Sequence, residues 1–186
     1  MAGLVLTPGA SATREQAALV AVDEAVSAGG IVVERIDFPY VLAGRRAPDR
    51  PPVLIRHVVE AVTGFAASQG VEPDRVALGG RSMGGRICSM AVAEGLPAAG
   101  LVLVSYPLHP PGKPEKLRTE HFPALSIPCL FVSGSRDAFG TPEELEEAVG
   151  AIGGPVTLVR LEGGDHGLRG KDTLVAEAVG TWLAAL

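Results

Sequence analysis

The sequence predicts a doubly wound α/β fold, in which a mostly parallel, six-stranded sheet carries helices on both faces. Six short apolar runs recur along the 186 residues, and most are near-continuous in Val, Leu and Ile. Such runs are typical of strands that are buried on both faces of a parallel sheet. Segments with helix-capping signals lie between the runs. This alternation favours a chain of βαβ units with right-handed crossovers.

The predicted strands can be placed from the apolar runs alone. They are GLVL (3–6), IVVERI (31–36), RVALGG (75–80), GLVLVS (100–105), PCLFVS (128–133) and VTLVRL (156–161). A strand with one solvated face would alternate strictly between apolar and polar residues, and only the last run does so, weakly. The pattern therefore favours a sheet with two covered faces.

The first two predicted helices have clear ends. TREQAALVAVDEAVSAGG opens on Thr13, and Gln16 three residues later completes a capping box. This helix is expected to stop at the Gly29-Gly30 pair. The next segment, PPVLIRHVVEAVTGFAASQG, has proline in its first turn and ends at Gly70.

Three further helices follow the later strands. One is expected over residues 83–94, before Gly95. Another begins with Thr141 as N-cap, Pro142 at the first helical position and Glu144 completing a capping box. The last helix has one apolar face at helical spacing, formed by Val175, Val179, Trp182, Leu183 and Leu186.

Composition indicates one ordinary globular domain over residues 1–186. Hydrophobic residues make up 47% and charged residues 20%, and the many glycines and prolines cluster between apolar runs rather than forming low-complexity sequence. A net charge of −5 argues against nucleic-acid binding, because nucleic-acid-binding surfaces are basic. The short N-terminal apolar run predicts neither a signal peptide nor a membrane span. We expect a soluble cytoplasmic protein, with Cys88 and Cys129 as reduced core thiols.

Metal ions and cofactors are not expected. Four histidines are scattered without ligand-like spacing, namely His57, His109, His121 and His166. The glycine-rich stretch GGRSMGGR (79–86) is not followed by Gly-Lys-Ser/Thr, so it does not match a phosphate-binding loop.

That same stretch carries the strongest chemical signal in the chain. Ligands of such sheets bind at the carboxyl ends of the strands. Directly after the third strand, Gly80, Ser82 and Gly84 form a G-x-S-x-G pattern between a strand and a helix. This arrangement predicts a strained turn that presents the Ser82 hydroxyl as a nucleophile. The alternative is that Ser82 is a plain helix N-cap.

A serine nucleophile needs a base, and the base needs an acid that orients it. His166 lies in the GGDHG loop after the sixth strand, and Asp137 follows the fifth strand. The order Ser82, Asp137, His166 is that of α/β-hydrolases. Asp165 is a rival acid, but adjacent loop residues rarely direct their side chains at each other. We therefore predict Asp137 as the partner of His166.

Two backbone N–H groups are expected to bind the oxyanion. Met83 follows Ser82 at the start of the predicted helix and supplies the first. The TPGASA loop after the first strand supplies the second, with Ala10 as the expected donor.

The rim of this site is expected to be cationic. Rim residues predicted from the loops are Arg45, Arg81, Tyr106 and His109, with Arg46, Arg50, Arg86 and Lys113 on or near it. Two interpretations stay open: solvated loop charge, or a collar that attracts an anionic small-molecule substrate. Loop 106–127 is too short for a large cap, so we expect a shallow, open pocket.

Several stretches resemble a known family. GGRSMGGR, YPLHPPGKPEKLRTEH, GSRDAFGTPEEL and GGDHG are similar to segments of small, dienelactone-hydrolase-like α/β-hydrolases. That group includes the hydrolase-like domain of subunit 3 of the non-specific-lethal chromatin complex. The resemblance covers nearly the whole chain. It implies a minimal α/β-hydrolase fold with Ser82, Asp137 and His166 as triad.

Two functional hypotheses follow. The first is a serine hydrolase that cleaves a small or exposed carboxylic ester or thioester through an acyl-enzyme. The second is a hydrolase-fold protein that serves as a binding or assembly module. A complete Ser-Asp-His set favours the first, because a binding module has no need of all three residues.

Overall fold

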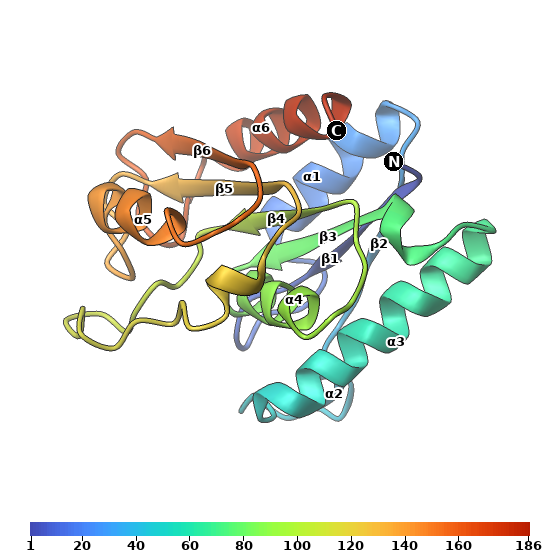
Figure 1. The fold of residues 1–186 in the computed structure, drawn as a ribbon, viewed down its shortest axis with the longest axis horizontal. Coiled ribbons are helices and arrows are strands. Elements are labelled where there is room, and N and C mark those ends of the chain that lie inside the picture. The colour runs from blue at the N-terminus through green and yellow to red at the C-terminus, as the bar shows by residue number, and fades with distance from the viewer.

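All six predicted strands form one sheet in the computed structural model, which describes residues 1–186 (Figure 1). The strands are β1 (Gly3–Thr7), β2 (Val32–Arg35), β3 (Val76–Arg81), β4 (Gly100–Val104), β5 (Cys129–Gly134) and β6 (Val156–Leu161). Their order across the sheet is β2-β1-β3-β4-β5-β6, and every neighbouring pair is parallel. The predicted fold class is therefore confirmed, and the sheet is wholly rather than mostly parallel.

Burial of the strands follows their position in this order. The strands β1, β4 and β5 are buried along their whole length, and β3 is buried up to Arg81. The two edge strands, β2 and β6, are half-exposed, with burial that changes from residue to residue. The weak alternation in VTLVRL thus has a physical cause, because an edge strand has fewer neighbours to cover it.

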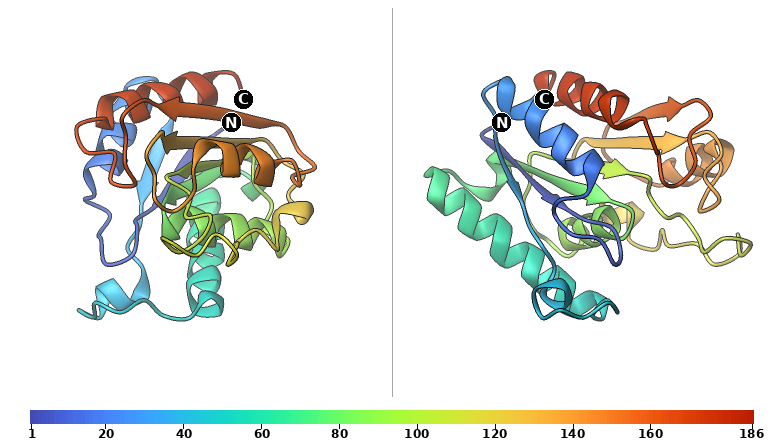
Figure 2. Two further views of the ribbon diagram at one scale, coloured as in Figure 1. Left: turned by 90° about the vertical axis from the view of Figure 1, so that its left-hand side faces the viewer. Right: turned by 180° about the vertical axis from the view of Figure 1, so that it is seen from behind.

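Helices cover both faces of the sheet (Figures 1 and 2). They are α1 (Ala17–Ala28), α2 (Pro39–Leu42), α3 (Pro51–Gln69), α4 (Met83–Ala93), α5 (Pro142–Val149) and α6 (Asp172–Ala184). The helices α1 and α6 lie together on one face and share a hydrophobic cluster with it. Residues of α3, α4 and α5 share a second, larger cluster on the other face. Both cysteines are free and buried in the core, as expected.

Most predicted helix ends agree with the structure. Around α5, the Thr141 hydroxyl accepts from the Glu144 N–H (3.2 Å) and the Glu144 carboxylate accepts from the Thr141 N–H (2.8 Å). The predicted capping box of Thr13 and Gln16 is wrong. Helix α1 begins at Ala17, and the Gln16 side chain accepts from the backbone N–H of Gly9 at 3.1 Å instead. The short helix α2 was not predicted.

The parallel arrangement brings the loops after β1, β3, β4, β5 and β6 to one edge of the sheet, where the strand arrows end in Figure 1. Loop 105–128, between β4 and β5, is the longest of them and contains one turn of 3₁₀ helix, Phe122–Ala124. None of the helices combines the length and the apolar character needed to span a bilayer.

Candidate active site

Ser82 occupies a sharp turn between β3 and α4. Its backbone dihedrals are φ 51° and ψ −118°, a region that side-chain-bearing residues rarely adopt. Holding a non-glycine residue there costs on the order of 1–3 kcal/mol. The flanking glycines permit the turn, because a Cβ on Gly80 or Gly84 would collide with Thr7 on the neighbouring strand β1. The strained turn expected at Ser82 is therefore present, and its φ is positive.

The structure brings Ser82, His166 and Asp137 together in one hydrogen-bonded row. Ser82 Oγ lies 2.8 Å from His166 Nε2. On the other side of the ring, Nδ1 lies 2.9 Å and 2.8 Å from the two carboxylate oxygens of Asp137, which is buried. The rival acid, Asp165, accepts instead from the Leu168 N–H at 3.0 Å. The imidazole is thus placed between the hydroxyl and the buried carboxylate.

Two neighbours hold the imidazole and its acid. The Phe139 ring stacks on His166, with ring centroids 4.0 Å apart and planes 27° apart. The Phe139 N–H also donates to Asp137 at 2.8 Å. On the other side, the Arg81 guanidinium donates to the backbone carbonyl of His166. The sequence did not indicate that Phe139 packs on His166. The only signal there is that an aspartate commonly accepts from the amide two residues later.

The loop after β1 leaves one amide free between two amides that are bonded. The Gly9 N–H donates to the Gln16 side chain, and the Ser11 N–H donates to the Tyr40 hydroxyl at 3.1 Å. Between them, the Ala10 N–H has no hydrogen-bond partner, and neither has the Met83 N–H at the start of α4. Both residues line the cleft that holds Ser82. The two expected oxyanion donors therefore have no partner in the protein, and they belong to residues that line the same cleft.

A cleft of about 470 Å³ opens over Ser82. Its lining consists of Gly9, Ala10, Arg81, Ser82, Met83, Arg86, Pro107, Arg118, Phe139 and His166. This volume lies within the range of about 300–1,000 Å³ for sites that bind small molecules. No large helical insertion covers it, because the longest loop at this edge contributes only Pro107 and Arg118 to the lining.

The lining differs from the predicted rim. Of the four predicted residues, only Arg81 lines the cleft. Arg45 forms an exposed ion pair with Asp49 at 2.8 Å. The other two are buried beside the cleft: the Tyr106 hydroxyl donates to the Arg118 carbonyl (2.7 Å), and His109 packs against Glu144.

His109 and Glu144 form an ion pair whose contribution to the stability of the fold depends on pH. A hydrogen bond to the Pro110 carbonyl and the nearby Glu144 raise the pKa of His109, while burial and, to a smaller extent, the Arg118 charge oppose them. The Thr141 N–H and His109 lower the pKa of Glu144. A raised histidine pKa stabilises the fold below the ordinary value of 6.5, and this contribution disappears as pH rises through the folded value. A lowered carboxyl pKa stabilises above 4.5, and this contribution disappears as pH falls through the folded value.

We expect Glu144→Gln to lower the free energy of unfolding by about 0.5 kcal/mol at about pH 5.5, the size of a partly exposed ion pair. The loss should be smaller at about pH 8.5, because the charge of His109 that pairs with Glu144 disappears as pH rises through its raised pKa. Glutamine keeps an acceptor for the Thr141 N–H, so the capping box is preserved. Urea unfolding at both pH values measures the difference, with Glu146→Gln, an exposed residue outside any ion pair, as control. An equal loss at both pH values would contradict the pairing.

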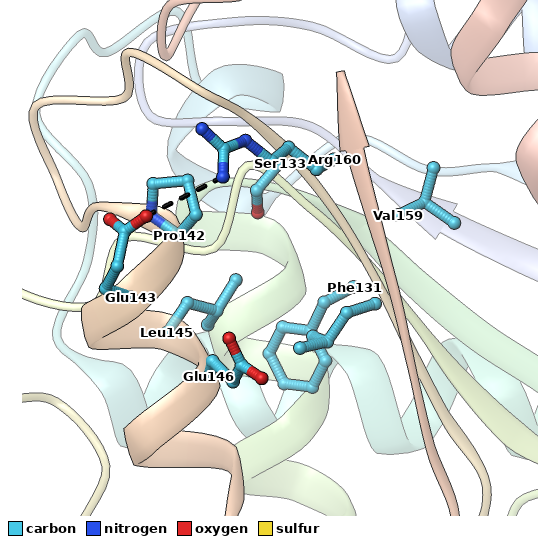
Figure 3. A pocket seen from close by; sticks show the side chains of 9 residues that line it. Phe131, Ser133, Pro142, Glu143, Leu145, Glu146, Val159 and Arg160 are labelled. Carbon is cyan, nitrogen blue, oxygen red and sulfur yellow. Dashed lines mark ion pairs between the residues drawn. The ribbon is translucent and has the colours of Figure 1, made fainter. Parts of the chain in front are cut away.

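A second hollow, of about 230 Å³, lies between α5 and the β5–β6 edge (Figure 3). The Phe131 and Leu145 side chains line it, and Arg160 pairs with Glu143 across its mouth at 3.6 Å. It contains none of the residues around Ser82, so it is separate from the candidate active site.

A comparison with known protein families identifies the family of this chain. A family model described as "Alpha/beta hydrolase domain" matches residues 1–180. The chain belongs to this family. Membership in the alpha/beta hydrolase family places the chain among the hydrolases, in agreement with the predicted fold.

Solved structures share this alpha/beta hydrolase fold at low sequence identity. One is an alpha-beta serine hydrolase homologue from Coxiella burnetii, with TM-score 0.80, 18% identity and coverage of 97% of this chain and 85% of that one. Another is Est1E from Butyrivibrio proteoclasticus with bound ferulic acid, with TM-score 0.80, 17% identity and coverage of 100% and 89%. A third belongs to a study of the metagenome-derived lipolytic enzymes LipS and LipT, with TM-score 0.78, 14% identity and coverage of 99% and 94%.

Proposed function

We propose that the protein is a serine hydrolase that cleaves a small or exposed carboxylic ester or thioester. The observation that carries this proposal is the hydrogen-bonded row of Ser82, His166 and Asp137 at a strained turn. The lipolytic enzymes of the same fold support the reaction class. The open cleft supports substrates that are small or that present an exposed end, because nothing in it encloses a long chain.

The reaction follows from the positions of these groups. Ser82 Oγ attacks the carbonyl carbon of the substrate while its proton passes to His166 Nε2, 2.8 Å away. The carbonyl electron pair moves onto oxygen, and the N–H groups of Met83 and Ala10 bind the resulting oxyanion. When the oxyanion collapses, the ester or thioester bond breaks and the leaving group takes the proton from Nε2. The product of this half-reaction is an acyl-Ser82.

Water completes the cycle by the same route. It attacks the acyl carbon while His166 Nε2 takes its proton, and collapse of the second oxyanion releases the carboxylic acid. The proton returns from Nε2 to Ser82 Oγ. During both steps Asp137 accepts a hydrogen bond from Nδ1–H, which fixes the tautomer that leaves Nε2 free to act as base.

A fluorophosphonate probe tests this proposal directly, because it reacts with an activated serine and not with an ordinary one. We expect one equivalent of label, located on Ser82 by mass spectrometry of the digested protein. Heat-denatured protein should take no label, since activation needs the folded site. A folded protein that takes no label would contradict the proposal and favour a binding or assembly module.

A further inference from the structure

The cleft over Ser82 is positively charged, although the protein as a whole has a net charge of −5. Arg81, Arg86 and Arg118 line it, and no aspartate or glutamate does. None of these three arginines forms an ion pair with a carboxylate, whereas the exposed Arg45 does. None of the three positive charges in the cleft is therefore neutralised by a direct ion pair.

Arg81 already has a structural contact. It donates to the backbone carbonyl of His166 and so holds the loop that carries the base. Burial lowers its pKa, while Asp137 opposes this effect. Arg81 is accordingly a positioning residue, which leaves Arg86 and Arg118 as the free cations of the cleft.

Arg86 lies one helical turn after Ser82 on α4, and its N–H donates to the Ser82 carbonyl at 3.1 Å. The two side chains therefore lie on the same face of the helix. The Arg86 Nε is buried and has no hydrogen-bond partner. The terminal nitrogens of this guanidinium also make no hydrogen bond in the protein, so in the cleft lining they are available to a ligand that accepts from them.

Arg118 reaches the same cleft from loop 105–128. Its backbone carbonyl is held by the Tyr106 hydroxyl, but its guanidinium makes only one long contact, 3.5 Å to the Pro107 carbonyl. Burial and the charge of Arg86 lower the pKa of Arg118. The two guanidinium groups thus lie close enough to repel each other.

Other side chains near this pair do not neutralise it. Burial and the charge of Arg86 lower the pKa of His121 to about 4, so this imidazole is neutral and bonded to the Ser89 hydroxyl at 2.7 Å. Glu120, next to it on the loop, is exposed and makes no ion pair. Two adjacent cations beside a nucleophile form a stable arrangement when an anion lies between them.

We propose that Arg86 and Arg118 bind a carboxylate of the substrate, and that the protein selects esters or thioesters with a carboxylate a few bonds from the scissile carbonyl. The inference rests on the proposed hydrolase function and names the substrate class of that site. The planar guanidinium presents paired N–H donors that match a carboxylate, which lysine would not. The carboxylate can belong to the acyl group or to the leaving group, and each is tested separately.

The test compares kcat/KM for a charged and a neutral ester in two pairs. For the acyl side these are the p-nitrophenyl monoester of glutarate and p-nitrophenyl butyrate. For the leaving-group side they are p-acetoxybenzoate and p-acetoxybenzamide. In at least one pair, we expect the charged-to-neutral ratio to fall about tenfold in Arg86→Gln and in Arg118→Gln, the size of one charge-assisted hydrogen bond. Arg56→Gln, which removes an exposed arginine of α3 outside any ion pair, should leave both ratios unchanged.

Two measurements separate failure of this inference from failure of the proposed function. Fluorophosphonate labelling of Ser82 in each variant shows that the fold and the nucleophile are intact, and turnover of the neutral ester by the same variant is the reference for each ratio. Glutarate binding, measured by calorimetry, does not depend on turnover, and its Kd should rise about tenfold in each cleft variant. Unchanged ratios in both pairs, or equal glutarate binding by wild type and variants, would overturn the carboxylate site while labelled Ser82 still supported the hydrolase.

Discussion

We expect Ser82→Ala and His166→Ala each to lower kcat for a p-nitrophenyl ester by on the order of 10⁶-fold. The hydroxyl and the imidazole act as a unit through the 2.8 Å contact between Ser82 Oγ and His166 Nε2. Without the base the hydroxyl is a poor nucleophile, and without the hydroxyl the base has nothing to activate. Steady-state kinetics on purified, folded variants measures the effect.

The double variant sharpens this test. Because either substitution alone disables the unit, Ser82→Ala/His166→Ala should be no slower than the single variants. Ser89 provides a matched control, since its hydroxyl also lies 2.7 Å from a histidine, His121, but it is fully buried and outside the cleft. Ser89→Ala should keep activity within a few-fold. Multiplicative losses in the double variant would show that Ser82 and His166 act independently.

Asp137→Asn should lower kcat by on the order of 10⁴-fold. Both carboxylate oxygens lie within 2.9 Å of His166 Nδ1 and stabilise the protonated form of that nitrogen. An amide that presents its NH₂ group there would favour the tautomer with the proton on Nε2, which cannot accept the Ser82 proton. The same kinetic assay measures the loss.

Asp165→Asn is the control for this prediction. Asp165 is adjacent to His166, but its carboxylate accepts from the Leu168 N–H and shapes the loop. Asparagine keeps an acceptor oxygen, so activity should stay within a few-fold of wild type. If Asp165→Asn lost more activity than Asp137→Asn, the acid would be wrongly assigned.

The core of the site could be predicted from sequence because strong rules govern it. Parallel strands deliver their following loops to one edge, so the positions of Ser82, Asp137 and His166 after β3, β5 and β6 were sufficient to bring them together. The glycines around Ser82 indicated the positive φ, since only small residues fit beside β1 there. Both signals are local to the chain or fixed by the topology.

The residues that line the cleft could not be predicted in this way. Loop 105–128 has no hydrophobic period, and its path depends on contacts such as the bond from the Tyr106 hydroxyl to the Arg118 carbonyl. The sequence therefore could not show that Arg118 lines the cleft over Ser82 while His109 contacts Glu144. Gln16 was misjudged for a similar reason. A glutamine three residues after threonine indicates a helix cap, but here the Gln16 side chain accepts a hydrogen bond from the Gly9 N–H.

The strand order also determines when the site comes into existence. Ser82 follows an interior strand, Asp137 follows the next strand but one, and His166 follows β6, which is held to the sheet through β5 alone. No fragment of the chain that lacks its last third can assemble the row of three, whatever its own stability. The Ser82 hydroxyl is therefore activated only in the completely folded protein. A nascent chain that still lacks His166 carries Ser82 without the base that makes its hydroxyl a nucleophile.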